Sequence, residues 1–264
     1  MIRAVGRLQF KFPFLAKLIN FVGHLVAAEG VIQRGAGKGL RFDTRGCHPG
    51  YLAGTSEPLE QELLLKCCHP GSIVYDVGAN AGFYAVIAAR AVGPLGRVYA
   101  FEPTPDLAER VRTNAALNSF KNIEIVEAAV SASNDVISFN VGASHTNNSI
   151  YKPTDPLQKS TISVRSIRLD TFAAEHEPPD LLLLDIEGAE IEALESGLQT
   201  IGRYRPIVMV EVHWLGNAFT DFFEQRLKPL GYSGSTYDGK ALPLERIRYH
   251  ALLRPKDAAD RNSV

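Results

Sequence analysis

The sequence has little cysteine and almost no excess of charge. Three cysteines occur in 264 residues, Cys47, Cys67 and Cys68, and no CxxC spacing is present. An odd count with two adjacent thiols argues against a disulfide framework and a cysteine zinc site, and it indicates a reducing compartment. The net charge is −1, so the chain lacks the excess of basic residues that is typical of nucleic-acid-binding domains. We therefore expect a cytoplasmic protein without a nucleic-acid partner.

Long uninterrupted apolar runs are also missing. Residues 1–28 combine large apolar and basic side chains, but Pro13 and Lys17 break the run, so it is too interrupted to span a bilayer. No small-residue cleavage site marks a signal peptide. Two interpretations stay open for this segment. It is either a helix that packs over the domain's cleft, or a basic amphipathic segment in peripheral contact with an anionic membrane.

From residue 59 onward, β-rich runs alternate with helical patterns, which predicts an α/β fold with a doubly wound parallel sheet. We divide the chain into residues 1–50 (a helical segment and a β-hairpin with a flexible tip), a domain over 51–256 and a frayed tail over 257–264. An extra strand near 137–141 and a long polar loop interrupt the alternation. Strands are predicted at 72–77, 97–102, 122–130, 181–186, 206–214 and 246–255, and helices at 58–68, 82–92, 106–118 (with Asp106 as N-cap), 189–198 and 218–232.

One turn carries an unusual motif, D-x-G-x-N-x-G, formed by Asp76, Gly78, Asn80 and Gly82. Its glycine spacing does not match the G-x-G-x-x-G of dinucleotide-binding folds. Gly78 is expected to let the turn pass beneath a ligand, and Gly82 to let the next helix pack on the strand. Asp76 is expected to receive a ligand's ammonium group. The alternative is a strand-to-helix turn that serves packing alone.

Ligands of parallel sheets bind at the carboxyl ends of the strands. Glu102 ends the second strand, 26 residues after Asp76, and can accept hydrogen bonds from both ribose hydroxyls of a nucleoside. Ala129 lies near the end of the third strand, which is either an ordinary strand end or a further ligand contact. Asp185 follows a run of four leucines and is expected in the cleft. Glu190 lies in a first helical turn, where the helix dipole alone also favours an acid.

These residues together resemble the FkbM-type S-adenosylmethionine-dependent methyltransferases. The resemblance covers roughly residues 50 to 253 and rests on DVGANAGFY, AFEP, NNS, LLLLDIEGAE and VEVH. It implies a class I methyltransferase (Rossmann-like) fold, with a mostly parallel seven-stranded sheet and an antiparallel C-terminal strand. It also implies S-adenosyl-L-methionine as cofactor and O-methylation of a hydroxyl on a sugar, glycan or secondary metabolite. The cofactor residues expected from motif and resemblance are Glu57, Asp76, Gly78, Asn80, Gly82, Glu102, Ala129 and Asp185.

Methyl transfer needs an oriented hydroxyl and a base. We expect Asp185 or His213 as the base. The expected acceptor contacts are His145, Asn148, Glu187 and Glu211. No second aspartate is evident near Asp185, so no metal is predicted.

One departure from the family pattern keeps a different hypothesis open. Leu183 stands where the family often has lysine, which allows a catalytically altered cofactor-binding member. A nicotinamide-dependent oxidoreductase is a further alternative from another enzyme class, because an acid at the position of Glu102 serves both kinds of nucleoside.

Overall fold

The structure is a computed structural model that describes residues 29–45, 47, 50–142, 160–242 and 248–256. The N-terminal segment, the loop with His145 and Asn148, and the C-terminal tail lie outside these residues. The expectations for them, including peripheral membrane contact, therefore stay predictions, as do the domain boundaries and the cytoplasmic location. No helix in the described part of the chain is long and apolar enough to cross a membrane.

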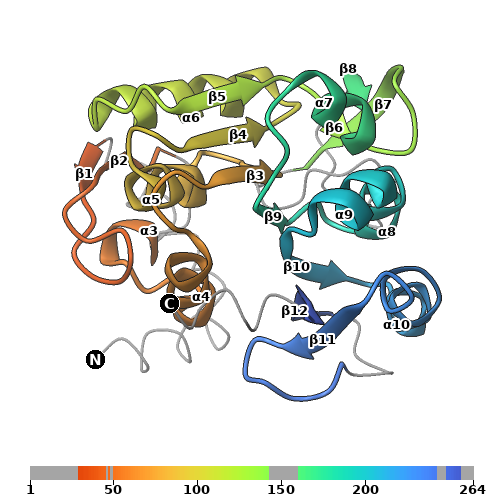
Figure 1. The fold of residues 1–264 in the computed structure, drawn as a ribbon. Coiled ribbons are helices and arrows are strands. Elements are labelled where there is room, and N and C mark those ends of the chain that lie inside the picture. Colours follow the sequence, from red (N-terminus) through yellow and green to blue (C-terminus); the bar gives the residue numbers. More distant parts are fainter. Residues whose placement is uncertain (1–28, 46, 48–49, 143–159, 243–247, 257–264) are drawn as a thin grey trace, which may run out of the picture.

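A seven-stranded sheet forms the centre of the fold (Figure 1). Its strand order is β5-β4-β3-β9-β10-β12-β11, and β12 runs antiparallel to both of its neighbours. The other neighbouring pairs are parallel. The predicted mostly parallel sheet with an antiparallel C-terminal strand is confirmed. The strands are β3 (Ile73–Val77), β4 (Arg97–Phe101), β5 (Ile123–Val126), β9 (Leu181–Leu184), β10 (Ile207–His213), β11 (Tyr232–Thr236) and β12 (Arg248–Pro255).

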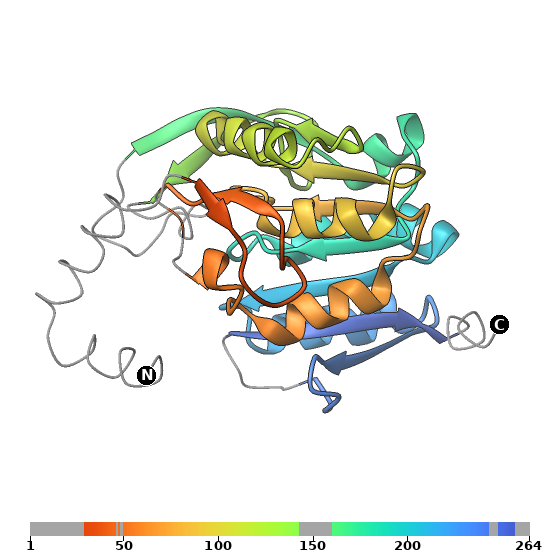
Figure 2. The ribbon, with the colours of Figure 1, turned by 90° about the vertical axis from the view of Figure 1, so that its left-hand side faces the viewer.

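Helices cover both faces of this sheet. On one face lie α4 (Pro58–Cys67), α5 (Phe83–Val92) and α6 (Pro105–Leu117), which cross the near side in Figure 2. On the other lie α7 (Leu169–Glu175), α8 (Glu190–Glu195), α9 (Leu198–Tyr204) and α10 (Asn217–Phe222). The four leucines of β9 show why both faces of the sheet must be covered. Leu182 and Leu184 join one buried cluster, and Leu181 and Leu183 join the other. A strand buried on both faces needs apolar residues at successive positions.

The predicted hairpin is present as β1 (Glu29–Val31) paired antiparallel with β2 (Arg41–Asp43), followed by the short helix α3 (Gly50–Ala53). Its tip is tied to the domain, which differs from the flexible tip we expected. The backbone N–H of Ala36 donates to Gln61 Oε1 at 2.9 Å, and Arg90 Nη1 donates to the carbonyl of Lys38 at 2.8 Å. Hydrogen-bond partners on α4 and α5, the first buried and the second exposed, anchor the tip, and a sequence pattern does not reveal them.

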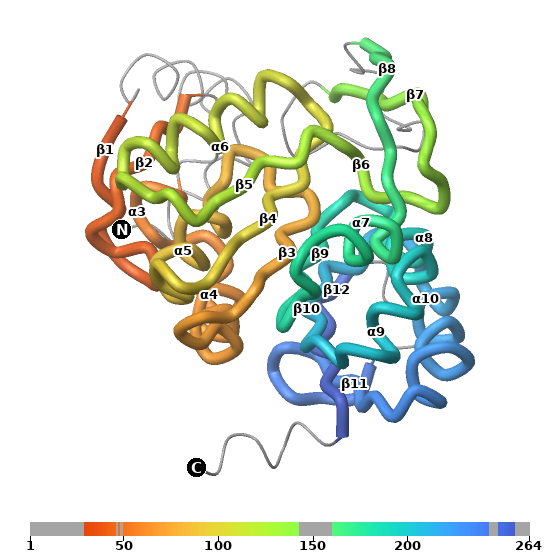
Figure 3. The backbone as a smooth tube through the Cα atoms, turned by 45° about the horizontal axis from the view of Figure 1, so that its top comes forward, coloured from red at the N-terminus to blue at the C-terminus, as the bar shows by residue number. Residues whose placement is uncertain are grey.

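A second, smaller sheet lies beside β5 and contains β6 (Ala129–Val130), β8 (Ser160–Ile167) and β7 (Val136–Val141) (Figure 3). The predicted strand 122–130 is therefore wrong as one element. A turn in which Ala128 N–H donates to the carbonyl of Val126 divides it into β5 and β6. The extra strand is confirmed, but it pairs with β8 and not with the main sheet. Neither β8 nor α7 was predicted.

Two helix ends differ from the prediction. Thr104, not Asp106, is the N-cap of α6, because Pro105 takes the first helical position and needs no N–H partner there. The helix predicted over 218–232 ends early: α10 passes into a π-helical turn, Phe223–Leu227, just before Pro229. Tyr232 instead begins β11, the seventh strand of the main sheet.

Candidate functional site

A cavity of about 520 Å³ opens at the carboxyl ends of the parallel strands. Its volume is within the range of small-molecule sites. It brings together segments that are far apart in the sequence: α3, β3, α5, β4, β6, β7, β10 and β12, with the residues just before α4 and just after β9. Among the predicted site residues, Glu57, Gly78, Asn80, Glu102, Ala129, Asp185, Glu187 and Glu211 line it. Asp76, Gly82 and His213 do not line it.

The turn after β3 has the backbone conformation that its sequence requires. Gly78 has φ +90°, and a Cβ there would lie 2.0 Å from the carbonyl oxygen of Asp185. Asn80 has φ +53°, and its Oδ1 accepts a hydrogen bond from Ala81 N–H at 2.7 Å. Asparagine is one of the few residues that enter this left-handed region readily, which explains how it can replace a glycine. Gly78 thus lets the ends of β3 and β9 meet at the cavity.

Gly82 has a different packing partner from the one expected. Its φ is +85°, and an added Cβ would lie 3.2 Å from the Cα of Val111 on α6. The residue therefore permits close approach of α6, whereas we expected it to seat α5 on the strand. Asp76 is 3 % exposed, below the turn. Burial, with repulsion from Glu102, raises the pKa of Asp76 to about 7. Its contact with a ligand stays a prediction.

The Glu102 carboxylate is held from two sides by backbone. Asn80 N–H donates to Oε2 at 2.9 Å and Thr104 N–H donates to Oε1 at 2.8 Å. The residue is 4 % exposed, and burial raises the pKa of Glu102 to about 7 against the two opposing hydrogen bonds. A carboxylate fixed in this way at a strand end is placed to accept hydrogen bonds from a diol.

The raised pKa of Glu102 makes a testable contribution to stability. The folded-state value lies above the ordinary value of 4.5, so ionisation destabilises the folded protein as pH rises from about 4.5 to about 7. We expect the unfolding free energy of wild type to fall relative to Glu102→Gln between about pH 5 and pH 8. The expected difference is about 1–3 kcal/mol. Urea unfolding of both cofactor-free proteins at the two pH values measures it, and parallel pH dependences would contradict it.

The other end of the cavity is acidic. Glu57 lines it, and Glu60 lies one helical turn further, 2 % exposed. The Tyr84 hydroxyl lies 2.7 Å from Glu57 Oε2 and 3.0 Å from Glu60 Oε2. The nearby His250 lowers the pKa of Glu57, whereas burial raises the pKa of Glu60 well above its usual range. Two neighbouring carboxyl groups thus differ strongly in their ease of ionisation.

His213 lies behind the carboxylates and is fully buried. Its Nδ1 is 2.8 Å from Glu190 Oε1, and its Nε2 is 3.4 Å from Glu211 Oε1. Burial disfavours the charged ring, but the hydrogen bond to Glu190, the contact with Glu211 and the charge of Asp185 outweigh it and raise the pKa of His213 to about 10. A ring whose pKa is raised and that does not line the cavity is less well placed to accept a proton from an acceptor there. The choice of base between His213 and Asp185 stays a prediction.

Asp185 is the better-placed candidate for the base. It lines the cavity with 38 % of its side chain accessible. The enclosing protein and, secondarily, the charge of Glu211 raise the pKa of Asp185 well above its usual range. Glu211 differs. Burial opposes its ionisation, but the contacts with His213 and His250 and the hydrogen bond from Arg248 lower the pKa of Glu211.

Four residues at the acidic end of the cavity were not predicted: Glu60, Tyr84, Arg248 and His250. Glu60 carried a weak signal, because it follows Glu57 by three residues on a helix. Arg248 and His250 enter through strand register, since β12 places His250 opposite Glu211 and Arg248 opposite His213.

Leu183, the departure from the family pattern, is 2 % exposed in the apolar cluster on the α4–α5 side and does not line the cavity. The only sequence hint for a catalytically altered member therefore has no counterpart among the cavity residues.

The sheet order, the glycine turn and the cavity at the strand ends define a class I methyltransferase fold. A family model described as the methyltransferase FkbM domain matches residues 76–233, more than half of the chain. The chain belongs to the FkbM methyltransferase family. This membership confirms the predicted enzyme class and cofactor, a methyltransferase that uses S-adenosylmethionine. The nicotinamide-dependent alternative is set aside.

Individual relatives are more distant. The chain is 27 % identical to the 2-O-methyltransferase NoeI of Sinorhizobium fredii over 67 % of this chain and 70 % of that protein. It is 28 % identical to the hexuronic acid methyltransferase AglP of Haloferax volcanii over 57 % of this chain and 60 % of AglP. Two other methyltransferase relatives are matched over only 34 % and 14 % of their length. A solved structure described as a methyltransferase, yhhF of Escherichia coli, covers 86 % of this chain and 98 % of its own, with TM-score 0.50 and 12 % identity, which supports the fold alone.

Proposed function

We propose that this protein transfers the methyl group of S-adenosylmethionine to a hydroxyl of a sugar or glycan. The observation that carries the proposal is one continuous cavity that joins the fixed Glu102 carboxylate to the acidic end with Asp185. A donor and an acceptor can therefore meet within it. The names of two relatives, a 2-O-methyltransferase and a hexuronic acid methyltransferase, support a carbohydrate acceptor.

The two ends of the cavity suit the two parts of the cofactor. Phe101, Pro103, Ala129 and Phe139 form an apolar wall near Glu102, which suits the adenine ring. The Glu102 carboxylate would accept hydrogen bonds from the ribose hydroxyls. The methionine part would then extend past Gly78 toward Thr55 and Glu57. Carboxylates at that end favour the positive charges of the sulfonium and the α-ammonium group.

Methyl transfer requires little covalent chemistry from the protein. The acceptor oxygen forms a bond to the methyl carbon while the carbon–sulfur bond breaks, and the electron pair of that bond goes to sulfur. The protein orients the hydroxyl in line with that bond. The hydroxyl proton passes to Asp185, whose raised pKa suits a general base. Glu187 and Glu211 line the same end and can accept hydrogen bonds from other hydroxyls of the sugar.

The acidic end also predicts the charge of the acceptor. Like charges repel strongly in a site with little water, so a neutral sugar is expected to react faster than its uronic acid counterpart in the metal-free protein. We expect transfer from methyl-labelled S-adenosylmethionine to glycans with neutral hexose or deoxyhexose ends, by about tenfold or more over uronic acids. The product is an O-methyl ether that resists alkaline hydrolysis.

A panel of matched neutral and uronic glycosides, with label counted before and after alkali, tests both statements. Alkali-labile label would indicate a methyl ester, and label on nitrogen would indicate another methyltransferase class. Either result would contradict the proposal.

A further inference from the structure

The free nitrogen of His213 points into a group of carboxylates. His213 Nε2 is 3.4 Å from Glu211 Oε1, 3.8 Å from Asp185 Oδ1 and 3.8 Å from Glu187 Oε2. None of these contacts is a hydrogen bond, and Nε2 has no hydrogen-bond partner among the described residues although the side chain is fully buried. This buried ring nitrogen faces three carboxylate oxygens and makes no hydrogen bond to any of them. Such an arrangement is typical of a metal ligand.

The spacing of these atoms suits a metal ion. One ligand atom each from Asp185, Glu211 and His213 lies within 4.8 Å of the others. In an octahedral shell with bonds of about 2.1 Å, neighbouring ligands lie about 3.0 Å apart and opposite ligands about 4.2 Å apart. The separations from Nε2 of 3.4 and 3.8 Å lie between these two values. Only small side-chain movements are needed to close the shell.

The second nitrogen of His213 is fixed in the manner of metal-bound histidines. Its Nδ1 lies 2.8 Å from Glu190 Oε1, and the same oxygen accepts a hydrogen bond from Gly188 N–H at 3.0 Å. Glu190 is fully buried. Metal-ligating histidines commonly donate their other N–H to a carboxylate, which fixes the tautomer and the ring orientation. This carboxylate–histidine pair is independent of the acidic residues that face Nε2.

The charge around the site also favours a cation. Carboxylates outnumber the cationic groups that face them, which in the described part of the chain are His213, His250 and Arg248. An excess of buried negative charge is costly unless it is paired or binds a metal. The carboxylates are Glu57, Glu60, Asp185, Glu187, Glu190 and Glu211.

We propose that Asp185, Glu211 and His213 bind one divalent cation of the Mg²⁺ or Mn²⁺ class, with Glu187 beside it and Glu190 positioning the histidine. The oxygen-rich ligand set suits these ions. Asp185, Glu187 and Glu211 line the cavity, so open coordination positions face it. The sequence predicted no metal because no second aspartate follows Asp185. The missing ligands are a glutamate and a histidine on β10, which runs beside β9.

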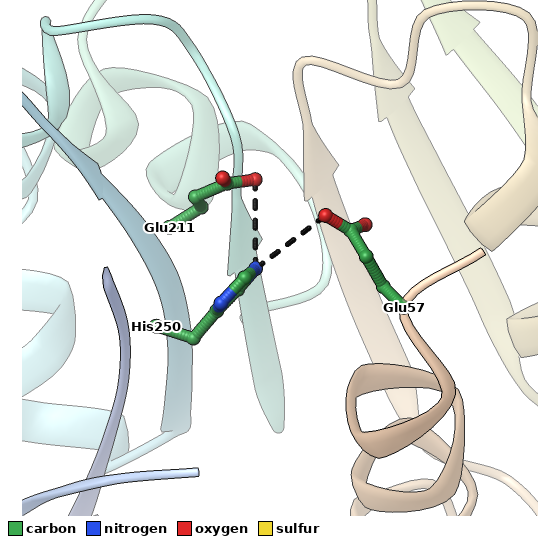
Figure 4. A group of neighbouring side chains, drawn as sticks. All are labelled: Glu57, Glu211 and His250. Carbon is green, nitrogen blue, oxygen red and sulfur yellow. Dashed lines mark ion pairs between the residues drawn. The ribbon is translucent and has the colours of Figure 1, made fainter. Parts of the chain in front are cut away.

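A neighbouring group of side chains is a weaker candidate. Glu57, Glu211 and His250 also place ligand atoms within 4.8 Å of one another, and Figure 4 shows His250 pointing between the two carboxylates. His250 Nε2 is 3.6 Å from both Glu57 Oε1 and Glu211 Oε2. His250 is 29 % exposed, and within the described residues its ion-pair contacts all involve Nε2, with no carboxylate at Nδ1. The group around His213 has the more complete support, and the two share Glu211.

The bound ion would act on the acceptor. With Asp185 bound to it, the ion would replace that carboxylate in activating the acceptor, because a divalent cation lowers the pKa of a coordinated hydroxyl and holds its oxygen in a fixed direction. This role depends on the proposed function, whereas the binding of the ion does not. The bound ion would also offset the repulsion between the acidic end of the cavity and a uronic acid acceptor.

Metal binding can be measured without activity. The full chain, free of any histidine tag and treated with EDTA, is titrated with Mn²⁺ while free Mn²⁺ is followed by electron paramagnetic resonance. We expect one ion per chain, with affinity weakened about tenfold or more in Asp185→Asn and His213→Gln, and about 10–100-fold in Glu190→Gln. His69→Gln removes an exposed histidine and is expected to change nothing. Each variant is also titrated with S-adenosylhomocysteine, because retained binding shows that the variant is folded.

The outcomes separate clearly. Absence of Mn²⁺ binding at millimolar concentration in a wild-type protein that binds S-adenosylhomocysteine would overturn the metal site and leave the proposed function standing. Unchanged Mn²⁺ affinity in Asp185→Asn and His213→Gln would overturn it too, as would loss of binding in His250→Gln alone. Absence of S-adenosylhomocysteine binding in wild type would instead count against the proposed function.

Discussion

Alanine in place of Gly78 is expected to abolish measurable binding of S-adenosylhomocysteine and to destabilise the fold. The added Cβ would lie 2.0 Å from the carbonyl oxygen of Asp185, and φ at this position is +90°. The obstacle is backbone, so no side-chain rotation relieves it. The ends of β3 and β9 would have to separate, and both Asp185 and the turn that orients Glu102 would move with them.

A second glycine with a similar φ separates the effect of backbone strain from the effect of the contact with Asp185. Gly71 has φ +89°, but a Cβ there would meet no described atom within 4 Å. Gly71→Ala therefore carries the conformational strain alone, about 1–2 kcal/mol. Gly78→Ala adds overpacking, so we expect a loss of about 3–5 kcal/mol and an affinity at least about 100-fold weaker, if the variant folds. Urea unfolding and calorimetric titration of both variants give the comparison. Equal effects at the two positions would show that the contact with Asp185 is not what excludes a side chain at position 78.

The second large effect is expected for Glu102→Ala. Two hydrogen bonds between ribose hydroxyls and a carboxylate would be lost, each worth about 1.5–3 kcal/mol. We therefore expect the affinity for S-adenosylhomocysteine to fall about 10²–10⁴-fold. Because the raised pKa of Glu102 shows that its charge is unfavourable in the empty cavity, this variant should not lose stability at pH 8 through loss of the charge. Weakened binding in a stable protein identifies a ligand contact.

Glu127→Ala provides the control for charge alone. Glu127 lies after β5, next to the cavity-lining Ala128, and its carboxylate pairs with Arg112 at the surface. We expect its replacement to change affinity by less than about twofold, since exposed ion pairs contribute little. If the two variants weaken binding equally, Glu102 has no special role. If only Glu127→Ala weakens it, the nucleoside lies further along the edge of the sheet than proposed.

The cofactor end of the site could be predicted from sequence because its determinants are local. The turn from Asp76 to Gly82 joins one strand to the next helix, and its left-handed positions demand glycine or asparagine wherever the chain folds this way. Glu102 follows the adjacent strand directly, and parallel strands bring their carboxyl ends to one edge. Both depend on spacing within single segments, which the sequence displays.

The acidic end could not be predicted in the same way. His250 faces Glu211 only because β12 pairs antiparallel with β10 in one particular register. A shift of β12 by one residue along β10 would send the His250 side chain to the other face of the sheet. The alternation of apolar residues in the sequence did not show which strand pairs with β12. The same limit explains why the sequence predicts Tyr232 as a helix end and does not reveal β11, since pairing with β12 is what makes that segment a strand. The environment of His213 could not be predicted for another reason: four acids from three segments surround the ring.

A crystal structure of the protein grown with S-adenosylhomocysteine tests the central claim most directly. We predict that the nucleoside occupies the cavity, with both ribose hydroxyls on the Glu102 carboxylate, adenine against Phe101 and Ala129, and sulfur directed toward Asp185. A nucleoside bound elsewhere, or in the cavity with its ribose away from Glu102, would contradict the account.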